Sequence, residues 1–417
     1  NYKGNTAFGF MACLPKNFMP DWLFYRIFCP PSPSDADYRM LDASYGTRKI
    51  EASLLANGFT KDDVIVIHPD HIAKVISAET KILGISSNDP LGIGPVTSTY
   101  SKPGEARMAF SLRKLLSNHA VKKYKPFKIL GGPGAWQLSS YPDERKDLGI
   151  DCVMLGEGEV SVPKLFKQIL DGDTKIDEVV HGENSSEEDI KDIVNSTVAG
   201  LVEVTRGCSR NCAYCIPSIR KMRSLPIDKI IREIKLNVSN GNSDVILQSE
   251  DVLLYKSNDT KVNAEAVIDL FEKVYAVPGV ENVTAVHASF ASVMDAPEVI
   301  PEIARILDLG GEKHPEIHFQ LGIETGSPKL IKKHMGGKVH PFSPDEWPDV
   351  VRDGMELLSS NNIVSVSTII MGLPGEELDD IQQTLDLVKS LKKFRSQIVP
   401  LMFTPLLTTR LEKSRNF

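Results

Sequence analysis

Three cysteines near the middle of the chain have the spacing with the clearest chemical meaning in the sequence. Cys208, Cys212 and Cys215 follow the pattern C-x3-C-x2-C. Thiolates are soft ligands that suit iron–sulfur clusters, and three of them on one short loop can bind three irons of a [4Fe-4S] cluster. The fourth iron is then left open, so a substrate can bind there.

Three other interpretations of these cysteines are weaker. A structural zinc site needs four protein ligands, and neither a second C-x2-C pair nor a suitably spaced histidine pair follows. A thioredoxin-like redox pair would use only Cys212 and Cys215 and would leave Cys208 without a role. A haem attachment site would need histidine at position 216, which is Ile216. The spacing therefore favours a cluster bound by all three cysteines.

The elements that must position the cysteines alternate between strand-like and helix-like runs. Six strand-like runs are expected at residues 201–205, 244–248, 283–287, 317–322, 364–371 and 398–403. No clean repeat period connects them, so we interpret them as βα units rather than a solenoid. Six such units predict a partial (β/α)6 barrel of TIM type, with its site at the carboxyl ends of the strands. The cysteine motif follows the first strand and would lie at that face.

The N-terminal part also alternates, as α/β domains do. Helices are expected at residues 48–57, 72–77, 108–117 and 162–170, and strands at residues 64–68, 81–86, 127–130 and 152–155. Three of the strands run into glycine-rich loops, at residues 88–95, 131–135 and 156–159. Ligands of doubly wound sheets bind outside the carboxyl ends of strands, where glycine lets the backbone approach closely. Each loop alone is a weak indication, because tight turns would also explain the glycines.

The length of 417 residues predicts two domains, or three. An acidic and polar stretch at residues 171–196 marks the expected boundary between them. We therefore expect a Rossmann-like domain with an N-terminal extension over residues 1–175, an acidic linker over 176–198, and a barrel over 199–417.

Composition narrows the class of protein. Apolar residues make up 41% and charged residues 25%, which is ordinary for a globular chain and unlike a disordered or fibrous one. The net charge of −7 argues against a protein that wraps nucleic acid, because neutralising phosphates needs a basic surface. Residues 220–223 are basic and would be either a local basic patch or a solvated helix start.

The remaining cysteines and the apolar N-terminal run point to a cytoplasmic protein. Cys13, Cys29 and Cys152 stand in apolar surroundings, so we expect small core residues rather than a disulfide framework, as in a reducing cytosol. Residues 7–29 are rich in aromatic side chains, but Lys16 and Arg26 are among the charges that interrupt them. We therefore expect no secretory or membrane-spanning segment and no membrane partner.

The cysteine motif resembles the cluster loop of radical S-adenosylmethionine (SAM) enzymes. The resemblance implies that Cys208, Cys212 and Cys215 bind the cluster and that SAM binds the open iron through its amino and carboxyl groups. It implies that cleaved SAM yields a 5′-deoxyadenosyl radical. It also implies SAM contacts from the cysteine loop and from strand ends, namely Tyr214, Ser249, Glu250, Ser289, Glu324 and Gly372. For Glu250 a helix N-terminal acid remains the alternative, and Glu376 is expected to begin a helix.

The glycine loops as a set resemble the cobalamin-binding Rossmann domain that precedes the core in one class of these enzymes. The residues that this resemblance assigns to cobalamin are Ser86, Leu91, Gly92, Gly131, Gly132, Gly134, Gly156, Glu157 and Gly158. The pattern D-x-H-x-x-G of proteins with a histidine ligand is absent, so the resemblance implies base-off cobalamin without a histidine on its lower face. We expect His71 to be a solvated helix residue. Arg48 and Tyr45 are candidates for a polar side chain near cobalt.

The two resemblances together imply methylation of an unactivated sp3 carbon. One SAM would supply the methyl group through methylcobalamin, and a second SAM would supply the deoxyadenosyl radical. Such an enzyme needs an external electron donor. The alternatives are another cobalamin radical SAM reaction, such as ring contraction or methylation of a small molecule or lipid, a tRNA methylthiotransferase, and a non-catalytic corrinoid or iron–sulfur carrier.

Residues 46–52, 89–95 and 131–138 look like the methanogen enzymes that methylate the α-carbon of a glutamine in methyl-coenzyme M reductase. This narrower resemblance implies a post-translational modification linked to methanogenesis. The partner would be a peptide segment of a protein, the α subunit of that reductase. The barrel mouth would then have to admit a chain rather than a metabolite.

Overall fold

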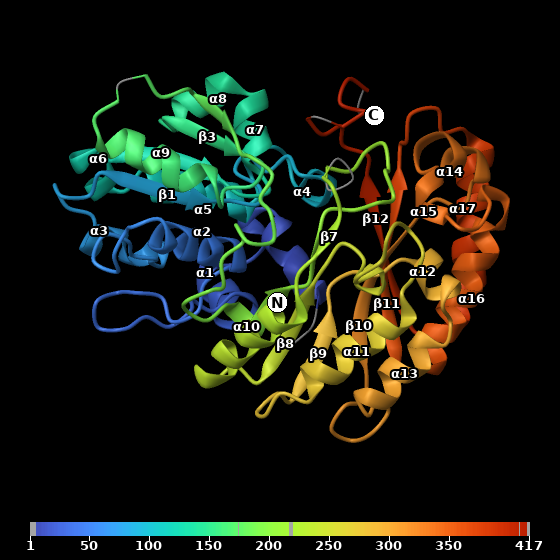
Figure 1. The fold of residues 1–417 in the computed structure, drawn as a ribbon. Helices are drawn as coiled ribbons and strands as arrows, with labels where there is room; N and C mark the ends of the chain where they lie inside the picture. The colour runs from blue at the N-terminus through green and yellow to red at the C-terminus, as the bar shows by residue number, and fades with distance from the viewer. Residues whose placement is uncertain (1–5, 174, 217–219, 408, 415–417) are drawn as a thin grey trace. The chain divides into compact units, whose positions relative to one another are not determined.

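The computed structural model describes residues 6–173, 175–216, 220–407 and 409–414. The chain divides into two compact units, and the boundary falls between Val198 and Ala199 (Figure 1). The first unit begins at Phe8, and the second also takes in the described residues before it. Strands and helices alternate in both units, so the prediction of an α/β protein is confirmed.

A four-stranded parallel sheet forms the centre of the first unit, and its strands lie in sequence order. The strands are β1 (Ile82–Ser86), β2 (Phe127–Gly131), β3 (Cys152–Leu155) and β4 (Val179–His181). Ser86 pairs with Gly131 at the carboxyl ends of β1 and β2. The loops that follow these two strands therefore start at the same edge of the sheet.

Helices cover both faces of this sheet. The helices of the first unit are α1 (Asp21–Leu23), α2 (Tyr45–Ala56), α3 (Ile72–Val75), α4 (Pro95–Tyr100), α5 (Arg107–Leu116), α6 (His119–Tyr124), α7 (Ala135–Ser140), α8 (Pro142–Asp147) and α9 (Ser161–Leu170). Ile82 packs into the apolar cluster that contains residues of α2 and α9, whereas its neighbour Leu83 packs against residues of α3 and α6. Successive strand side chains point to opposite faces, so the sheet has a packed core on each side.

The predicted strand at residues 64–68 is wrong. Only Ile67 makes a bridge, to Arg39, and the Arg39 guanidinium donates to the carbonyl oxygens of Val64 and Lys61. The segment is thus held by a neighbouring loop and not by the sheet, and Pro69 ends it. The predicted strands at residues 81–86, 127–130 and 152–155 are confirmed as β1, β2 and β3.

Residues 176–198, for which we expected a linker, group with the first unit. They contain β4, which pairs with β3. Ile190 and Ser196 are buried, and the Ser196 carbonyl oxygen accepts a hydrogen bond from Arg48 Nε of α2 at 2.9 Å. The acidic composition of this segment suggested a solvated linker. The segment instead contains a short edge strand and then packs against α2.

Six parallel strands form the centre of the second unit, as predicted. They are β5 (Leu201–Glu203), β8 (Asp244–Gln248), β9 (Asn282–Ala285), β10 (Ile317–Glu324), β11 (Ile363–Met371) and β12 (Ser396–Met402). They form two three-stranded sheets, β5-β8-β9 and β10-β11-β12. A parallel bridge between His287 and Gln320 connects the two sheets. The strand order therefore follows the sequence through an open (β/α)6 barrel.

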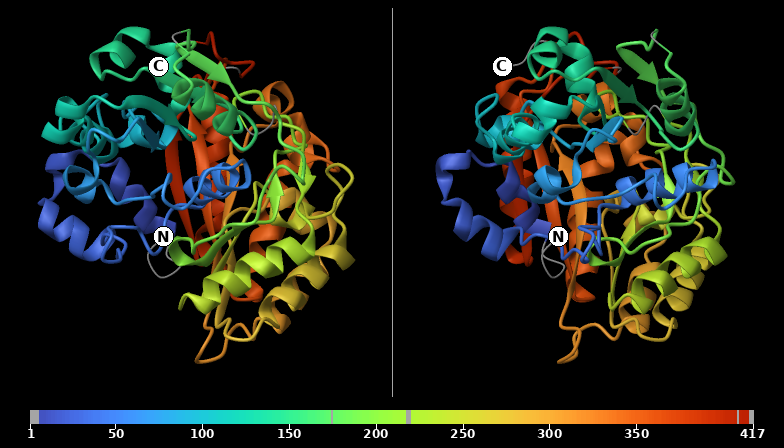
Figure 2. Two further views of the ribbon diagram at one scale, coloured as in Figure 1. Left: turned by 60° about the vertical axis from the view of Figure 1, so that its left-hand side comes forward. Right: turned by 90° about the vertical axis from the view of Figure 1, so that its left-hand side faces the viewer.

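The helices of the second unit are α10 (Ile227–Ser239), α11 (Ala264–Tyr275), α12 (Phe290–Asp295), α13 (Val299–Ile306), α14 (Pro328–His334), α15 (Gly336–Val339), α16 (Trp347–Ser360) and α17 (Leu378–Ser390). In both views of Figure 2, as in Figure 1, the long helices run along the outside of the strands. On α10, Ile230, Ile234 and Asn237 are buried at helical spacing, which is the stripe expected of a helix packed on one face.

A short antiparallel hairpin interrupts the barrel where the cysteines occur. Its strands are β6 (Thr205–Arg206) and β7 (Arg223–Ser224), and Thr205 pairs with Ser224. Arg223 therefore lies in a strand and α10 begins at Ile227, so of the two interpretations of residues 220–223 the helix start is wrong. Residues 217–219 lie outside the described residues.

The apolar N-terminal run forms short helical turns: η1 (Thr6–Cys13), α1 and η3 (Phe24–Phe28). Over the described residues, the helices are all too short or too polar to cross a membrane. All six cysteines are free, and Cys13 and Cys152 are buried as expected. Cys29 is exposed just after η3, so the expectation of a core residue there is wrong.

Candidate functional site

A cavity of about 240 Å3 lies at the carboxyl ends of the strands of the second unit. Its walls come from the cysteine loop (residues 207–216) and from residues on or just after β8, β9, β10 and β11. Cys208, Cys212 and Cys215 all line it. The volume is just below the range of about 300–1,000 Å3 for small-ligand pockets, so the cavity is compact.

Burial and mutual proximity raise the pKa values of the three thiols. Burial raises the pKa of Cys208 to about 11, and the neighbouring Cys212 contributes in the same direction. Burial also raises the pKa of Cys215 to about 12, with further contributions from Cys212 and Glu250. The pKa of Cys212 is raised as well, mainly by burial. Metal binding must therefore displace protons from these thiols.

The cysteine loop is fixed to two other segments of the second unit. Ala213 N donates to the carbonyl oxygen of His334 at 2.8 Å, and Arg410 donates to the carbonyl oxygen of Asn211 at 2.6 Å. The loop opens on Gly207, which has φ +82°, and a Cβ there would lie 2.5 Å from the Lys221 carbonyl oxygen. Glycine is required at this point because the loop turns against the segment that returns to β7.

The donor set fits a cluster rather than a single ion. Within the described ranges no three His, Cys, Asp or Glu side chains converge as ligands of one metal ion. In a [4Fe-4S] cluster each thiolate binds a different iron, so the three sulfurs need only surround a common space. Cys208, Cys212 and Cys215 meet that requirement by lining the same cavity.

Four of the six residues expected to contact SAM line this cavity: Tyr214, Glu250, Ser289 and Glu324. Ser289 caps the N-terminus of α12, where its hydroxyl accepts from Ser292 N at 3.1 Å. The Tyr214 hydroxyl donates to the sulfur of Met335 at 3.8 Å. Burial raises the pKa of Tyr214 well above its usual value. These side chains come from the cysteine loop and from the ends of β8, β9 and β10.

Ser249 and Gly372 are not among the described residues that line the cavity. The Ser249 hydroxyl bonds to that of Thr205 and accepts from Asp251 N at 3.1 Å, so it shapes the turn after β8. Gly372 N donates to the Glu376 carboxylate at 2.6 Å. Glu376 therefore closes the turn after β11, and α17 begins two residues later at Leu378.

A buried lysine beside Glu324 was not found from the sequence. Lys338 Nζ lies 3.1 Å from Glu324 Oε1, and Thr368 donates to the other carboxylate oxygen at 3.2 Å. Burial alone would lower the pKa of Lys338, but Glu324 and Cys212 outweigh burial and raise it. A Cβ on Gly322 would lie 1.9 Å from Glu324 Oε1, so glycine makes room for this pair. Lys338 comes from α15, and no spacing rule points to it.

Asp251 is a second residue that the sequence did not select. It is buried, lines the cavity, and accepts from Ser292 Oγ through Oδ2 at 2.8 Å. Its Oδ1 has no hydrogen-bond partner in the described part of the chain. A buried carboxylate oxygen without a donor is costly, and a cationic group of a ligand in the cavity would satisfy it.

The residues expected to contact cobalamin lie in the first unit at the carboxyl ends of β1, β2 and β3. Gly132 has φ +92°, and a Cβ there would lie 2.8 Å from Ser86 Oγ. A Cβ on Gly134 would lie 2.5 Å from the carbonyl oxygen of Asn88. These glycines let the loop after β2 pack against the loop after β1, so intramolecular packing explains them.

The other expected cobalamin residues also shape loops. Leu91 is buried, and Gly131 ends β2. Gly92 and Gly156 have positive φ values of +71° and +84°. Gly158 approaches Ile50 of α2, and Glu157 accepts from Ser185 N at 3.0 Å.

The loop after β1 has an internal brace that sequence reasoning missed. Buried Asp89 accepts from Ile93 N at 2.9 Å and from Gln137 Nε2 at 2.7 Å. Gln137, which is also buried, accepts from Leu91 N at 2.8 Å. The shape of this loop is therefore fixed before any ligand binds.

Arg48 is not placed to face a ligand. It is buried, with its guanidinium donating to Glu51 at 2.9 Å and to the carbonyl oxygens of Met40 and Ser196 at 2.7 and 2.9 Å. The ammonium of Lys49 lies over the ring of Tyr45, with Nζ 4.9 Å from the ring centroid. His71 is half-buried and contacts the ring of Tyr38, so it is less solvated than expected.

Comparison with known proteins finds a family match within the barrel. Residues 202–388 match the Radical SAM superfamily. The chain is 24% identical over 233 residues to a tRNA-2-methylthio-N(6)-dimethylallyladenosine synthase of Natranaerobius thermophilus, covering 55% of this chain and 48% of the relative. A synthase of the same name from Clostridium botulinum is 28% identical over 246 residues, covering 58% and 51%. The chain thus spans about half the length of these relatives.

The fold extends the similarity to the first unit. The chain resembles the radical S-adenosylmethionine methyltransferase TsrM from Kitasatospora setae, whose structure holds cobalamin and a [4Fe-4S] cluster. The TM-score is 0.61 at 13% identity, and the match covers 89% of this chain and 71% of the other. A second TsrM structure, with tryptophan substrate and a SAM analogue bound, gives the same TM-score at 14% identity, with coverage of 88% and 72%. At this identity the likeness concerns the fold.

Proposed function

We propose, from the match of residues 202–388 to the Radical SAM superfamily, that this chain is a cobalamin-dependent radical SAM methyltransferase. Its reaction is methylation of an unactivated sp3 carbon. One observation carries the proposal: a single cavity at the strand ends gathers three thiols, several carboxylates and a lysine. That donor set suits an iron–sulfur cluster together with a zwitterionic ligand.

Each group on the cavity wall has a defined task. Cys208, Cys212 and Cys215 hold the cluster. Glu250 and Oδ1 of Asp251 would accept hydrogen bonds from the ammonium group of SAM, and Lys338, which is near Cys212, would meet the carboxylate of SAM. When bound, the cluster and SAM supply a radical that removes a hydrogen atom from carbon, and cobalamin supplies a methyl group.

The first unit holds the cobalamin in this proposal. Three glycine-containing loops lie at the carboxyl ends of its parallel strands, and the brace of Asp89 and Gln137 keeps one of them in shape. The likeness of the fold to a cobalamin-binding methyltransferase supports this assignment. The absence of D-x-H-x-x-G from the sequence supports cobalamin without a histidine lower ligand.

The substrate we propose is a glutamine α-carbon in the α subunit of methyl-coenzyme M reductase. This finer assignment is supported by the sequence resemblance of residues 46–52, 89–95 and 131–138. It requires a protein partner, an external donor of low-potential electrons and a cytoplasmic setting. The net charge of −7 supports a partner other than nucleic acid.

The test is anaerobic incubation with SAM, cobalamin, reductant and a glutamine-containing peptide of the reductase, followed by mass spectrometry. We expect the mass gain of one methyl group in place of hydrogen, located on the glutamine. Methyl on another residue, or on none, would reject the substrate. The Cys212→Ala variant is the matched control and should give no product.

A second candidate is methylthiolation of tRNA, which the names of the sequence relatives favour. The acidic net charge weighs against it. Parallel incubation with unmodified tRNA decides between the two, because a methylthio group on adenosine would replace the first proposal. A tryptophan arm tests a small-molecule substrate of the kind bound in TsrM.

A further inference from the structure

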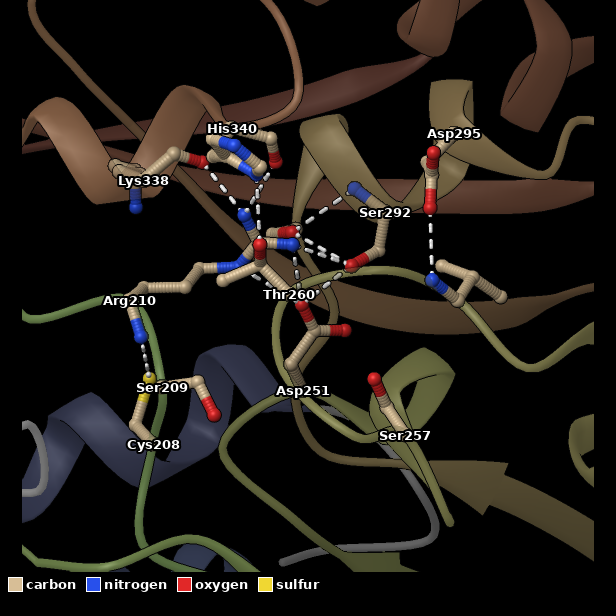
Figure 3. A network of polar contacts seen from close by, with 12 residues as sticks. Cys208, Ser209, Arg210, Asp251, Ser257, Thr260, Ser292, Asp295, Lys338 and His340 are labelled. Carbon is tan, nitrogen blue, oxygen red and sulfur yellow. Dashed lines mark hydrogen bonds and ion pairs between the residues drawn. The ribbon is translucent and has the colours of Figure 1, made fainter.

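A buried guanidinium connects the cysteine loop to three other segments of the barrel. Arg210 stands between Cys208 and Cys212 and is 4% exposed. Its Nη1 donates to the carbonyl oxygen of Lys338 at 2.8 Å and to that of His340 at 3.2 Å. Figure 3 shows the guanidinium reaching between this segment on one side and Asp251 and Ser292 on the other.

The charge of Arg210 is balanced by one carboxylate. Its Nε and Nη2 each lie 3.3 Å from Asp251 Oδ2, and Nη2 also donates to Ser292 Oγ at 2.5 Å. The side chains of Arg210 and Asp251 are 5% and 3% exposed. Two opposite charges thus lie side by side in a poorly hydrated environment, where electrostatic effects on neighbouring groups are stronger than in water.

Both residues of the pair lie on the same cavity wall as a cysteine that we assign to the cluster. Arg210 N donates to Cys208 Sγ at 3.4 Å. Arg210, Asp251 and Cys208 all line the same cavity. The ion pair and the thiol therefore border the same buried space.

We propose that the ion pair of Arg210 and Asp251 sets the reduction potential of the cluster bound by Cys208, Cys212 and Cys215. The inference rests on the proposed function. Reduction transfers one electron from an external low-potential donor to the cluster and makes it more negative by one charge. The positive guanidinium stabilises the reduced form, and the carboxylate opposes it. Charge, burial and hydrogen bonds to sulfur are among the properties that set such potentials.

The two charges predict shifts of opposite sign. We would measure the midpoint potential of the cluster by anaerobic redox titration, followed by electron paramagnetic resonance. Arg210→Gln should lower the midpoint potential, Asp251→Asn should raise it, and Arg210→Lys should stay between Arg210→Gln and the parent. Shifts of the same sign, or no shift in either variant, would overturn the proposal.

Controls separate electrostatics from folding. Ser292→Ala removes a neutral contact of both charged groups and should leave the potential close to that of the parent. Should Arg210→Gln lose iron, Asp251→Asn and Arg210→Lys still decide, because a lowered or unchanged potential in Asp251→Asn overturns the proposal. Failure of the proposed function has a different signature: the parent protein would form no methylated peptide, while its cluster could still be titrated in the absence of any substrate.

Discussion

The Nζ atom of Lys338 lies 3.1 Å from Oε1 of Glu324 on the cavity wall, and both side chains are about nine-tenths buried. Glu324 has φ +64°, so the end of β10 turns in a backbone conformation that is rare for this residue type. The pair places opposite charges inside the space that we assign to a zwitterionic ligand. Each charge is poised to exchange its partner for one group of that ligand.

Removing the charge of Lys338 alone should destabilise the protein more than removing the charges of Lys338 and Glu324 together. Lys338→Met leaves the Glu324 carboxylate buried without its cation, which costs about 3–5 kcal/mol of stability. The double variant Lys338→Met, Glu324→Gln removes both charges and should recover much of that loss. Thermal unfolding measures both effects, and a double variant no more stable than Lys338→Met would show that the pair does not act as a unit. Both variants should bind SAM more weakly in equilibrium dialysis.

Cys212→Ala should abolish cluster binding without unfolding the chain. The protein purified and reconstituted without oxygen should hold about four irons, and the variant should lose most of them together with deoxyadenosine formation. Cys29→Ala is the matched control, because Cys29 is exposed and outside the cavity. Iron analysis and circular dichroism check the result. A full complement of iron in Cys212→Ala would refute the ligand assignment.

Gly132→Ala should destabilise the first unit and weaken cobalamin binding. The alanine would adopt φ +92° and would place its Cβ 2.8 Å from Ser86 Oγ. Gly172→Ala is the control, because φ is +83° there but nothing lies within 4 Å of the added Cβ. We expect the control to lose about 1–2 kcal/mol from backbone strain, and Gly132→Ala to lose about 1–3 kcal/mol more from crowding.

Cobalamin retention after gel filtration distinguishes the two glycine variants further. The control should retain as much cobalamin as the parent. Equal losses of stability and of cobalamin in both variants would mean that the contact between the loops after β1 and β2 does not matter for binding.

The ionised carboxylate of Asp380 should stabilise the folded protein near neutral pH, and this contribution should be lost in acid. Burial favours a higher pKa for this carboxyl, but hydrogen bonds from Lys329, Ser327 Oγ and Glu377 N outweigh burial and lower the pKa. A carboxyl with a lowered pKa in the folded state stabilises the protein above its unfolded pKa and loses that contribution as pH falls through the folded value. Asp380→Asn should therefore be less stable than the parent by about 1–3 kcal/mol near neutral pH.

The pH dependence gives the check on Asp380. The difference between parent and Asp380→Asn should shrink once the pH falls below about 4, as read from melting temperatures. The exposed neighbour Asp379, which bonds only locally to Gln383 at 2.6 Å, provides the control variant Asp379→Asn. A gap between parent and Asp380→Asn that stays constant down to pH 3, where about all free carboxyls are protonated, would contradict this account.

Much of the fold could be predicted because the strands of both units are short apolar runs between turn signals. All six barrel strands were found this way, as were β1, β2 and β3. The run at residues 64–68 has the same composition, but the pairing of Ile67 with Arg39 depends on a distant loop. The strand β4 escaped notice because it has only three residues and lies at a sheet edge within an acidic segment.

Site residues could be predicted where their spacing in the sequence indicates their chemistry. Residues that tertiary packing brings to the site could not. Most of the cavity wall was predicted from three cysteines within eight residues and from polar residues that follow strands. Lys338 reaches the site from a short helix, and Arg210 occupies one of the unspecified positions of the cysteine motif, so spacing alone selects neither. Ser249 and Gly372 follow strands as predicted but do not line the cavity. Ser249 bonds to Thr205 and Gly372 bonds to Glu376 instead.

The central claim is tested most directly by counting products in one anaerobic reaction with the glutamine peptide. Each methylated peptide should be accompanied by one S-adenosylhomocysteine and one 5′-deoxyadenosine, with no product when cobalamin is left out. Methylated peptide formed without deoxyadenosine, or formed equally well without cobalamin, would contradict the account.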